Sequence, residues 1–355
     1  MEVEIELKLS TQALAGPIII EKLLPQLDAT IEQSEVELSN SYFDTLDRDF
    51  RKNDMGLRIR GCQHHYEQTL KTAGKGVAGL QQRPEYNISL GLHLHSVPEK
   101  PDLSLFPADV WPSFFNLPEV QNTLICQFST QFIRSVFLLT WSDRTQVELV
   151  WDRGQVLACG RSDAINEIEL ELKHGNVDIL FSLGQQIAEL MPVTIGLLSK
   201  AARGYRLMDE TKSEVSQKQP KPLTLICNED DIKQGDKIVL SAYLAKTLRQ
   251  WQKMSMVLPN SQEAHIQWGH ELKYYLSLLE KIMQQLSAKQ QDPPLQHTIV
   301  SLHEILLSLE ELQHEGVDNL TNEQQTVVEQ GLLALVSDKK CIKVQLQIMQ
   351  WLSKA

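Results

Sequence analysis

The sequence lacks paired cysteines and long apolar runs, and each absence excludes a class of protein. Its five cysteines are widely scattered, with no C-x-x-C motif and no His/Cys pair at zinc-binding spacing. This favours free thiols in a reducing cytoplasm. No apolar run approaches the roughly 18–20 residues that a membrane-spanning helix needs, and the first residues lack the basic and apolar regions of a signal peptide. We therefore expect a cytoplasmic protein without a membrane segment.

The sequence also lacks an excess of positive charge. Its formal net charge is −12, which argues against a general binder of nucleic acid or of anionic membranes but leaves room for a local basic pocket. The length of 355 residues suggests two domains, and an apolar fraction of 42% is enough for a sizeable core.

The first residues alternate charged and apolar side chains without a break. In a strand, successive side chains point to opposite faces. One face of residues 2–9 would therefore carry the charges of Glu2, Glu4, Glu6 and Lys8, and the other Val3, Ile5, Leu7 and Leu9. An edge strand facing solvent gives the same pattern, so this strand alone does not distinguish a functional face from a solvated one.

Later strand-like runs repeat the pattern. We expect strands at 36–43, 55–61, 64–72, 83–90, 125–141, 145–152, 156–161 and 165–173. A helix is predicted over 12–27 and another over 176–191, with a glycine-containing hairpin loop at 71–79, irregular structure at 91–124 and a hairpin turn at 152–155.

At least six of these strands carry charges of both signs on one face. Periodicity alone leaves two interpretations open: a solvated outer face, or an inverted barrel whose charged faces line the lumen and whose apolar faces meet helices. A closed barrel of eight strands leaves room for about one small ligand. Charges of both signs would coexist there only with a bound polyanion and divalent cations to neutralise them.

The period changes to 3.6 in the last third of the chain. Residues 212–222 are polar, contain Pro220 and Pro222, and are predicted to form a linker. Helices are expected near 236–258, 261–288, 295–314, 321–335 and 338–352, of which Thr321 and Gln324 would cap the fourth. Antiparallel helices with short connections form a bundle.

The ordered charged residues resemble a known family. Glu4-Ile5-Glu6-Leu7-Lys8 is similar to the E-x-E-x-K signature of the CYTH domain of triphosphate tunnel metalloenzymes. Arg58-Ile59-Arg60, Lys71, Arg83-Pro84-Glu85, Arg134, Glu148 with Asp152, Glu167-x-Glu169-x-Glu171 and Ser199-Lys200 then follow in the family's order. The resemblance is to bacterial inorganic triphosphatases that join this domain to a CHAD-like helical extension. It implies an α+β fold: an antiparallel eight-stranded β-tunnel flanked by helices at 1–211, a linker at 212–222 and a CHAD-like helical bundle at 223–355.

The resemblance further implies metal-dependent hydrolysis of inorganic triphosphate to diphosphate and phosphate. Mg²⁺ or Mn²⁺ would be held by carboxylates, namely Glu4, Glu6, Glu148, Asp152, Glu169 and Glu171. The substrate would be held by cations, namely Lys8, Arg58, Arg60, Lys71, Arg83, Arg134, Lys200 and Arg203. Catalysis is assigned to Glu4, Glu6, Lys8 and Lys71, with the general base left open among Glu4, Glu6 and Lys71. Ion pairing explains Glu2, Glu67, Glu85, Glu167 and Arg203 equally well, and His64, His65, His93 and His95 are expected at the surface.

Other functions stay open. A class IV adenylyl cyclase, or a thiamine or nucleoside triphosphatase, would use the same charges, and a non-catalytic polyphosphate-binding module is a further alternative. CHAD domains carry basic and histidine-rich helices, whereas residues 221–355 hold 13 lysines and arginines against 16 acidic residues, with Arg249 as their only arginine. An acidic bundle is a poor polyanion clamp, so we favour a structural or regulatory role for it.

Overall fold

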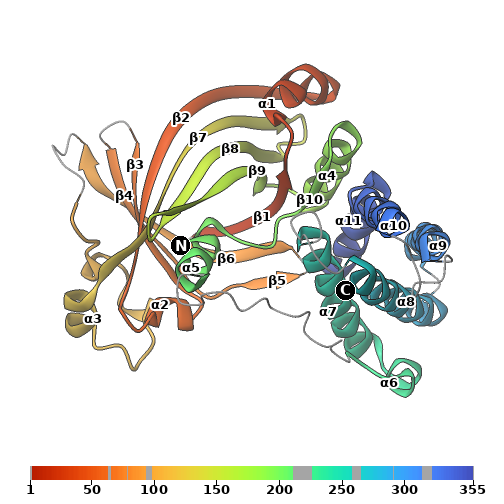
Figure 1. Cartoon of the computed structure of the whole chain (residues 1–355). Coiled ribbons are helices and arrows are strands. Elements are labelled where there is room, and N and C mark those ends of the chain that lie inside the picture. The colour runs from red at the N-terminus through yellow and green to blue at the C-terminus, as the bar shows by residue number, and fades with distance from the viewer. Residues whose placement is uncertain are drawn as a thin grey trace.

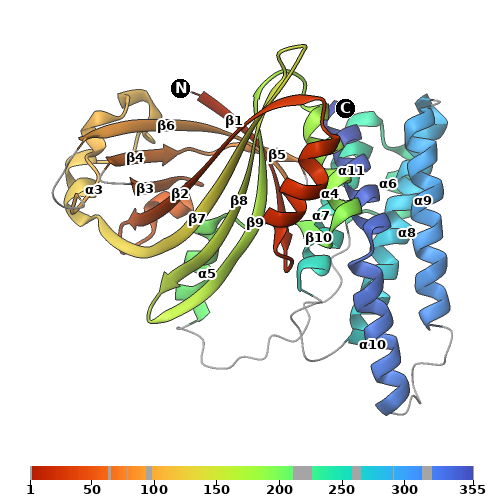
Figure 2. The same ribbon diagram turned by 90° about the horizontal axis from the view of Figure 1, so that it is seen from above.

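The computed structural model describes residues 2–62, 65–77, 79–92, 98–210, 226–257, 265–290, 292–313 and 322–354. Long curved strands form a ring in one part of the molecule, and the helices of the last third gather in the other (Figure 1 and Figure 2). The predicted linker 212–222, together with Thr321, His64, His93 and His95, lies outside the described residues.

The ring consists of eight strands that are paired antiparallel throughout. They are β1 (Glu2–Thr11), β2 (Ala29–Asp44), β3 (Gly56–Cys62), β4 (His65–Lys71), β6 (Leu80–Leu92), β7 (Ile125–Trp141), β8 (Gln146–Ala158) and β9 (Arg161–His174). Their order is β1-β9-β8-β7-β2-β3-β4-β6, and β6 pairs back onto β1. Two short strands, β5 (Lys75–Val77) and β10 (Val193–Ile195), pair with β6 and β1. The prediction of an eight-stranded antiparallel tunnel is therefore confirmed.

The ring has its apolar faces outside. Leu7 of β1 and Leu170 of β9 are fully buried in one core with Phe181 of α4 (Asp178–Leu190). The predicted helix over 12–27 consists of α1 (Ala15–Ile18), a π-helical turn at Ile19–Leu23 and a 3₁₀ turn at Leu24–Gln26. Because helices cover the apolar face, the alternating charged side chains are left to line the interior, as the inverted-barrel interpretation predicts.

The rest of the ring is covered by shorter elements. A second core is formed with the help of four short elements. They are α2 (Asp49–Lys52), α3 (Leu117–Thr123) and 3₁₀ turns at Leu103–Leu105 and Ala108–Val110. That core packs Phe50 and Trp111 edge to face. α5 (Lys200–Glu210) lies against β7, β8 and β9, which places the start of this helix next to the tunnel.

Two local predictions are wrong. The hairpin turn predicted at 152–155 does not exist, because β8 runs straight through it and turns only at Cys159 and Gly160, whose φ angles are +50° and +72°. Gly154 instead allows a close approach of β7, since a Cβ there would lie 2.1 Å from the carbonyl oxygen of Gln131. The loop predicted at 71–79 contains β5, which pairs with β6.

The last third forms the predicted helical region. Its helices are α6 (Glu229–Gln234), α7 (Lys237–Val257), α8 (His265–Gln290), α9 (Pro293–Gln313), α10 (Asn322–Val336) and α11 (Lys339–Lys354). α4 joins this region to the ring: a Cβ on Gly184 would lie 3.1 Å from Leu7 and 3.3 Å from Leu346 of α11. Among the described helices, none combines the length and apolar character needed to cross a bilayer.

Candidate active site

The ring encloses a cavity of about 720 Å³. Most residues predicted to bind substrate or metal line it, from seven of the ring strands and from α5. They are Glu4, Glu6, Lys8, Arg58, Arg60, Lys71, Arg83, Arg134, Glu148, Glu169, Glu171 and Lys200. From the predicted set, Asp152 and Arg203 are the two that do not line it.

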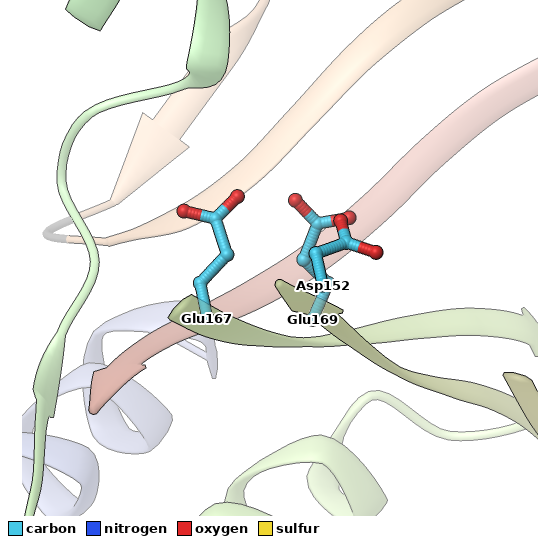
Figure 3. Close-up of side chains that lie close together, drawn as sticks. All are labelled: Asp152, Glu167 and Glu169. Atoms are coloured by element: carbon cyan, nitrogen blue, oxygen red, sulfur yellow. The ribbon is translucent and has the colours of Figure 1, made fainter. Parts of the chain in front are cut away.

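Six of the charged residues form a paired cluster, which we define as Lys8, Arg134, Lys200, Asp152, Glu167 and Glu169. The three carboxylates come from neighbouring strands and point to the same side of the sheet (Figure 3). Lys200 Nζ lies 2.6 Å from oxygens of both Asp152 and Glu167 and 2.9 Å from Glu169.

Arg134 and Lys8 complete the paired cluster. Arg134 holds Asp152 through two hydrogen bonds of 2.8 and 2.7 Å and Glu169 through a third of 2.7 Å. Lys8 contacts Glu169 and lies 3.1 Å from Glu167. Burial alone would raise the pKa of Glu169, but Lys200, Lys8 and Arg134 outweigh burial and hold it well below its usual value. Three cations thus balance three carboxylates.

A second set of carboxylates is not balanced in this way. Glu6, Glu171 and Glu148 are register neighbours on β1, β9 and β8, and we call them the acidic row. Burial, with the nearby charge of Glu169, raises the pKa of Glu6 to about 7, although Lys8 lies 3.4 Å away. Burial also raises the pKa of Glu171, which the Lys173 ammonium at 2.6 Å offsets only in part. The row carries more negative than positive charge.

The opposite imbalance occurs on β3. Arg58 and Arg60 are two residues apart and form what we call the basic pair. Burial, together with the charges of Arg58 and Arg134, lowers the pKa of Arg60 to about 10. Its Nε donates to Asn40 Oδ1 at 3.0 Å. No carboxylate oxygen among the described residues lies within 4.0 Å of the Arg60 guanidinium.

Lys71 and Arg83 are engaged by other groups of the chain. The Lys71 ammonium contacts Glu4 and lies 3.1 Å from Glu85. Although burial raises the pKa of Glu85, Lys71 and Arg58 lower it to about 2. The Arg83 guanidinium donates to the carbonyl oxygen of Thr72 at 3.1 Å and to Asp54.

The two predicted residues outside the lining lie just behind it. Asp152 is fully buried against Arg134 and Lys200. Arg203 Nε donates to Asp163 at 2.8 Å, and its guanidinium is 3.7 Å from Glu167. The sequence pattern did not show whether Glu167 belongs to the site or only forms an ion pair. Its spacing from Glu169 does place both side chains on the same face of the strand. It gave no signal at all that Arg249 lines the cavity.

These features define a closed β-tunnel whose interior is lined by charged groups of both signs. The chain belongs to the CYTH domain family, because the family's model matches residues 2–205. This match confirms the resemblance on which the charged residues were assigned. The CHAD-like character of the helical third lies outside the matched residues and stays a prediction.

The chain is similar to several proteins that have been described. An inorganic triphosphatase of Haemophilus influenzae is 38% identical over 208 residues, which are 58% of this chain and 54% of that protein. The chain thus matches about half the length of this curated relative. A Hippeastrum protein described as a candidate adenylyl cyclase with dominant triphosphatase activity is 17% identical, with a TM-score of 0.41, over 60% of this chain and 98% of its own. A candidate adenylate cyclase from Vibrio parahaemolyticus is 14% identical, with a TM-score of 0.32, over 54% and 90%. At these TM-scores the structural likeness supports no statement about function.

Proposed function

We propose that the protein hydrolyses inorganic triphosphate to diphosphate and phosphate inside the tunnel. The observation that carries this proposal is the separation of the basic pair from the acidic row within one cavity. Buried charges without partners are costly. A bound polyanion would balance Arg60 and the part of the Arg58 charge that Glu85, 3.4 Å away, does not offset. A divalent cation would balance Glu6, Glu171 and Glu148. The relative from Haemophilus influenzae, an inorganic triphosphatase, supports the same substrate.

The acidic row fits Mg²⁺ or Mn²⁺, with Glu4 as a further carboxylate of the same cavity. Glu169 fits less directly, because Lys8, Lys200 and Arg134 occupy both of its oxygens. Hard cations prefer carboxylate oxygens, and the raised pKa of Glu6 shows that this carboxylate has too little positive charge around it. Such a cation, when bound, would neutralise phosphate oxygens and make a water molecule more acidic. Asp152 fits less directly, because Arg134 and Lys200 occupy both of its oxygens; we assign it the positioning of these two cations.

Phosphoryl transfer requires positioning and charge stabilisation more than a covalent nucleophile. Arg58 and Arg60 would hold phosphate oxygens in the geometry that a guanidinium favours. Lys8 and Arg134 are fixed by the paired cluster and would present their remaining hydrogen-bond capacity to the substrate without reorganising. Lys200 would contribute its charge, because three carboxylates take its three N–H groups. Of the candidates for the general base, Glu6 suits the role best where Glu171 and Glu148 hold the cation and leave its oxygens free, because burial raises its pKa to about 7. Lys71 is held by Glu4 and Glu85.

The test is phosphate release by the purified full chain. Tripolyphosphate is incubated with the protein and Mg²⁺ or Mn²⁺, and a parallel reaction contains a chelator. We expect release only with the metal. Protein that stays folded by circular dichroism and releases no phosphate with either cation would contradict the proposal.

No observation favours a substrate with an organic group. Tyr42 and Tyr205 are the aromatic residues among those that line the cavity. Tyr42 stacks on Phe128 at 4.8 Å, and Tyr205 donates to Asp44 at 2.6 Å. A parallel screen of ATP and thiamine triphosphate separates the cyclase and organic triphosphatase alternatives. Metal-independent binding without turnover, mapped to the helical third, would indicate the polyphosphate-binding module instead.

The cysteines are free thiols, which fits the cytoplasmic location that we propose.

A further inference from the structure

One side chain of the helical third reaches the tunnel cavity. Arg249 of α7 lines it, and no other described residue after residue 226 does so. Arg249 is also the only arginine after residue 220, in a segment that carries more acidic than basic residues. A generally basic surface therefore does not explain a guanidinium at this place.

The packing of α7 holds Arg249 at the tunnel. Its neighbours Leu248 and Trp251 are fully buried in the core that also contains Leu7 of β1. Gln252, one turn further along, is 1% exposed and lies against the turn between β5 and β6, since a Cβ on Gly79 would be 3.8 Å from its Nε2. Arg249 is thus attached to a helix that cannot leave the tunnel wall without opening this core.

Arg249 differs from the inner cations in its exposure and its partners. Its side chain is exposed, whereas those of Lys8 and Lys200 are 7% exposed. In the described part of the chain, no carboxylate oxygen lies within 4.0 Å of its guanidinium. It is an outer cation of the same cavity, without a carboxylate partner among the described residues.

We propose that Arg249 binds the phosphoryl groups of linear inorganic polyphosphates that extend beyond the tunnel centre, and so favours chains longer than triphosphate. This inference rests on the proposed function. The cavity of about 720 Å³ lies in the upper part of the usual size range of ligand sites and has room beyond three phosphoryl groups. A guanidinium binds phosphate oxygens in pairs. Because Arg249 lies away from the acidic row's strands, on α7, its contribution is to binding and not to the chemical step.

The experiment compares Arg249→Gln with Lys253→Gln, an equal charge change at an exposed position of α7 that does not line the cavity. Dissociation constants are measured by calorimetry without divalent metal, and KM and kcat with metal, for tripolyphosphate and for a medium-length linear polyphosphate. For Arg249→Gln we expect the long-chain dissociation constant and KM to rise about tenfold. The values for tripolyphosphate should change less than twofold, kcat should stay unchanged, and Arg249→Lys should recover part of the loss.

Equal effects on both substrates, no effect on the long chain, or the same loss in Lys253→Gln would overturn the assignment. The calorimetric comparison does not depend on turnover. A wild-type protein that binds both polyanions but hydrolyses neither would therefore disprove the proposed function while leaving the role of Arg249 in binding to be decided by the same data.

Discussion

The paired cluster and the two unbalanced groups lie in the same cavity but differ in how their charges are compensated. In the cluster, Lys200 contacts three carboxylates, and opposite charges outweigh burial by raising the pKa of Lys200 and lowering that of Glu169. In the acidic row, burial raises the pKa of Glu6 to about 7, and in the basic pair it lowers that of Arg60 to about 10. The neighbours of Glu6 and Arg60 supply too little opposite charge.

This difference distinguishes charged residues that stabilise the fold from charged residues that would bind ligands. A buried charge with hydrogen-bonded partners contributes to the folded structure, and removing one partner leaves the others exposed to the full cost of desolvation. A buried charge without partners raises the free energy of the empty protein, and a ligand that supplies the missing charge regains that free energy on binding. On this view the cluster makes the tunnel rigid, and the row and the pair bind the ligands.

The largest expected effect comes from breaking the paired cluster. Lys200→Met leaves Asp152, Glu167 and Glu169 with too little positive charge, and we expect the free energy of unfolding to fall by about 3–5 kcal/mol. Denaturant unfolding of the metal-free protein measures it. Lys339→Met is the matched control, because Lys339 pairs with Glu189 at 2.7 Å on the surface with 56% of its side chain exposed; there we expect less than about 1 kcal/mol. Equal costs for the two variants would show that the cluster is not the scaffold.

The next effect concerns the acidic row. Glu6→Gln keeps the size of the side chain but removes the charge proposed to bind metal and the group proposed to accept a proton. We expect kcat for tripolyphosphate to fall by about 10²–10³-fold, with a smaller change in KM and no loss of stability. Glu32→Gln, at an exposed position of β2 that does not line the cavity, is the control and should keep the wild-type rate. If Glu6→Gln keeps a near-normal kcat, the metal assignment has to be abandoned.

The third prediction is the opposite of the first: it expects a loss of substrate binding with little change in stability. Arg60 is a buried cation of the unbalanced kind, so Arg60→Met removes both its repulsion from Arg58 and its hydrogen bond to Asn40. We expect these effects to offset, with a change in unfolding free energy of less than about 1 kcal/mol. KM for tripolyphosphate should nevertheless rise by roughly 10–100-fold, because a charged hydrogen bond to substrate is lost. A stability loss as large as that of Lys200→Met would mean that the basic pair belongs to the scaffold.

Sequence patterns predicted the tunnel because its main signal is local. The alternation at residues 2–9 and 165–173 assigns each side chain to a face, and the register confirms it by placing Lys8 opposite Glu169. The closing contact between β1 and β6 joins segments about 80 residues apart and has no local signal. It followed only from the resemblance to a family. The hairpin predicted at 152–155 was wrong because Asp-Arg-Gly is a common turn sequence, whereas here the glycine serves a close strand contact.

The division of the charges into paired and unbalanced groups was not predictable from spacing. Glu167 and Glu171 lie on the same face of β9. Among the described residues, Glu167 is held by Lys8 and Lys200, whereas Lys173 is the one cation in an ion pair with Glu171. The difference depends on α5, which brings Lys200 to β9 from a later part of the chain. Arg249 likewise reaches the cavity only through the packing of α7 on the tunnel wall, so no strand pattern includes it.

The smallest expected effect tests the acidic row through pH. A carboxyl group whose pKa is raised to about 7 holds its proton below that pH, and a metal ion must displace this proton to bind. The affinity for Mn²⁺ should therefore fall as the pH is lowered below 7, by at most about tenfold per pH unit for one proton, and level off above pH 7. Calorimetric titration between pH 5.5 and 8 measures this slope, and in Glu6→Gln it should be shallower, with Glu171 supplying what remains because its pKa is also raised. An unchanged slope in Glu6→Gln would place the displaced proton on another group and remove Glu6 from the metal site.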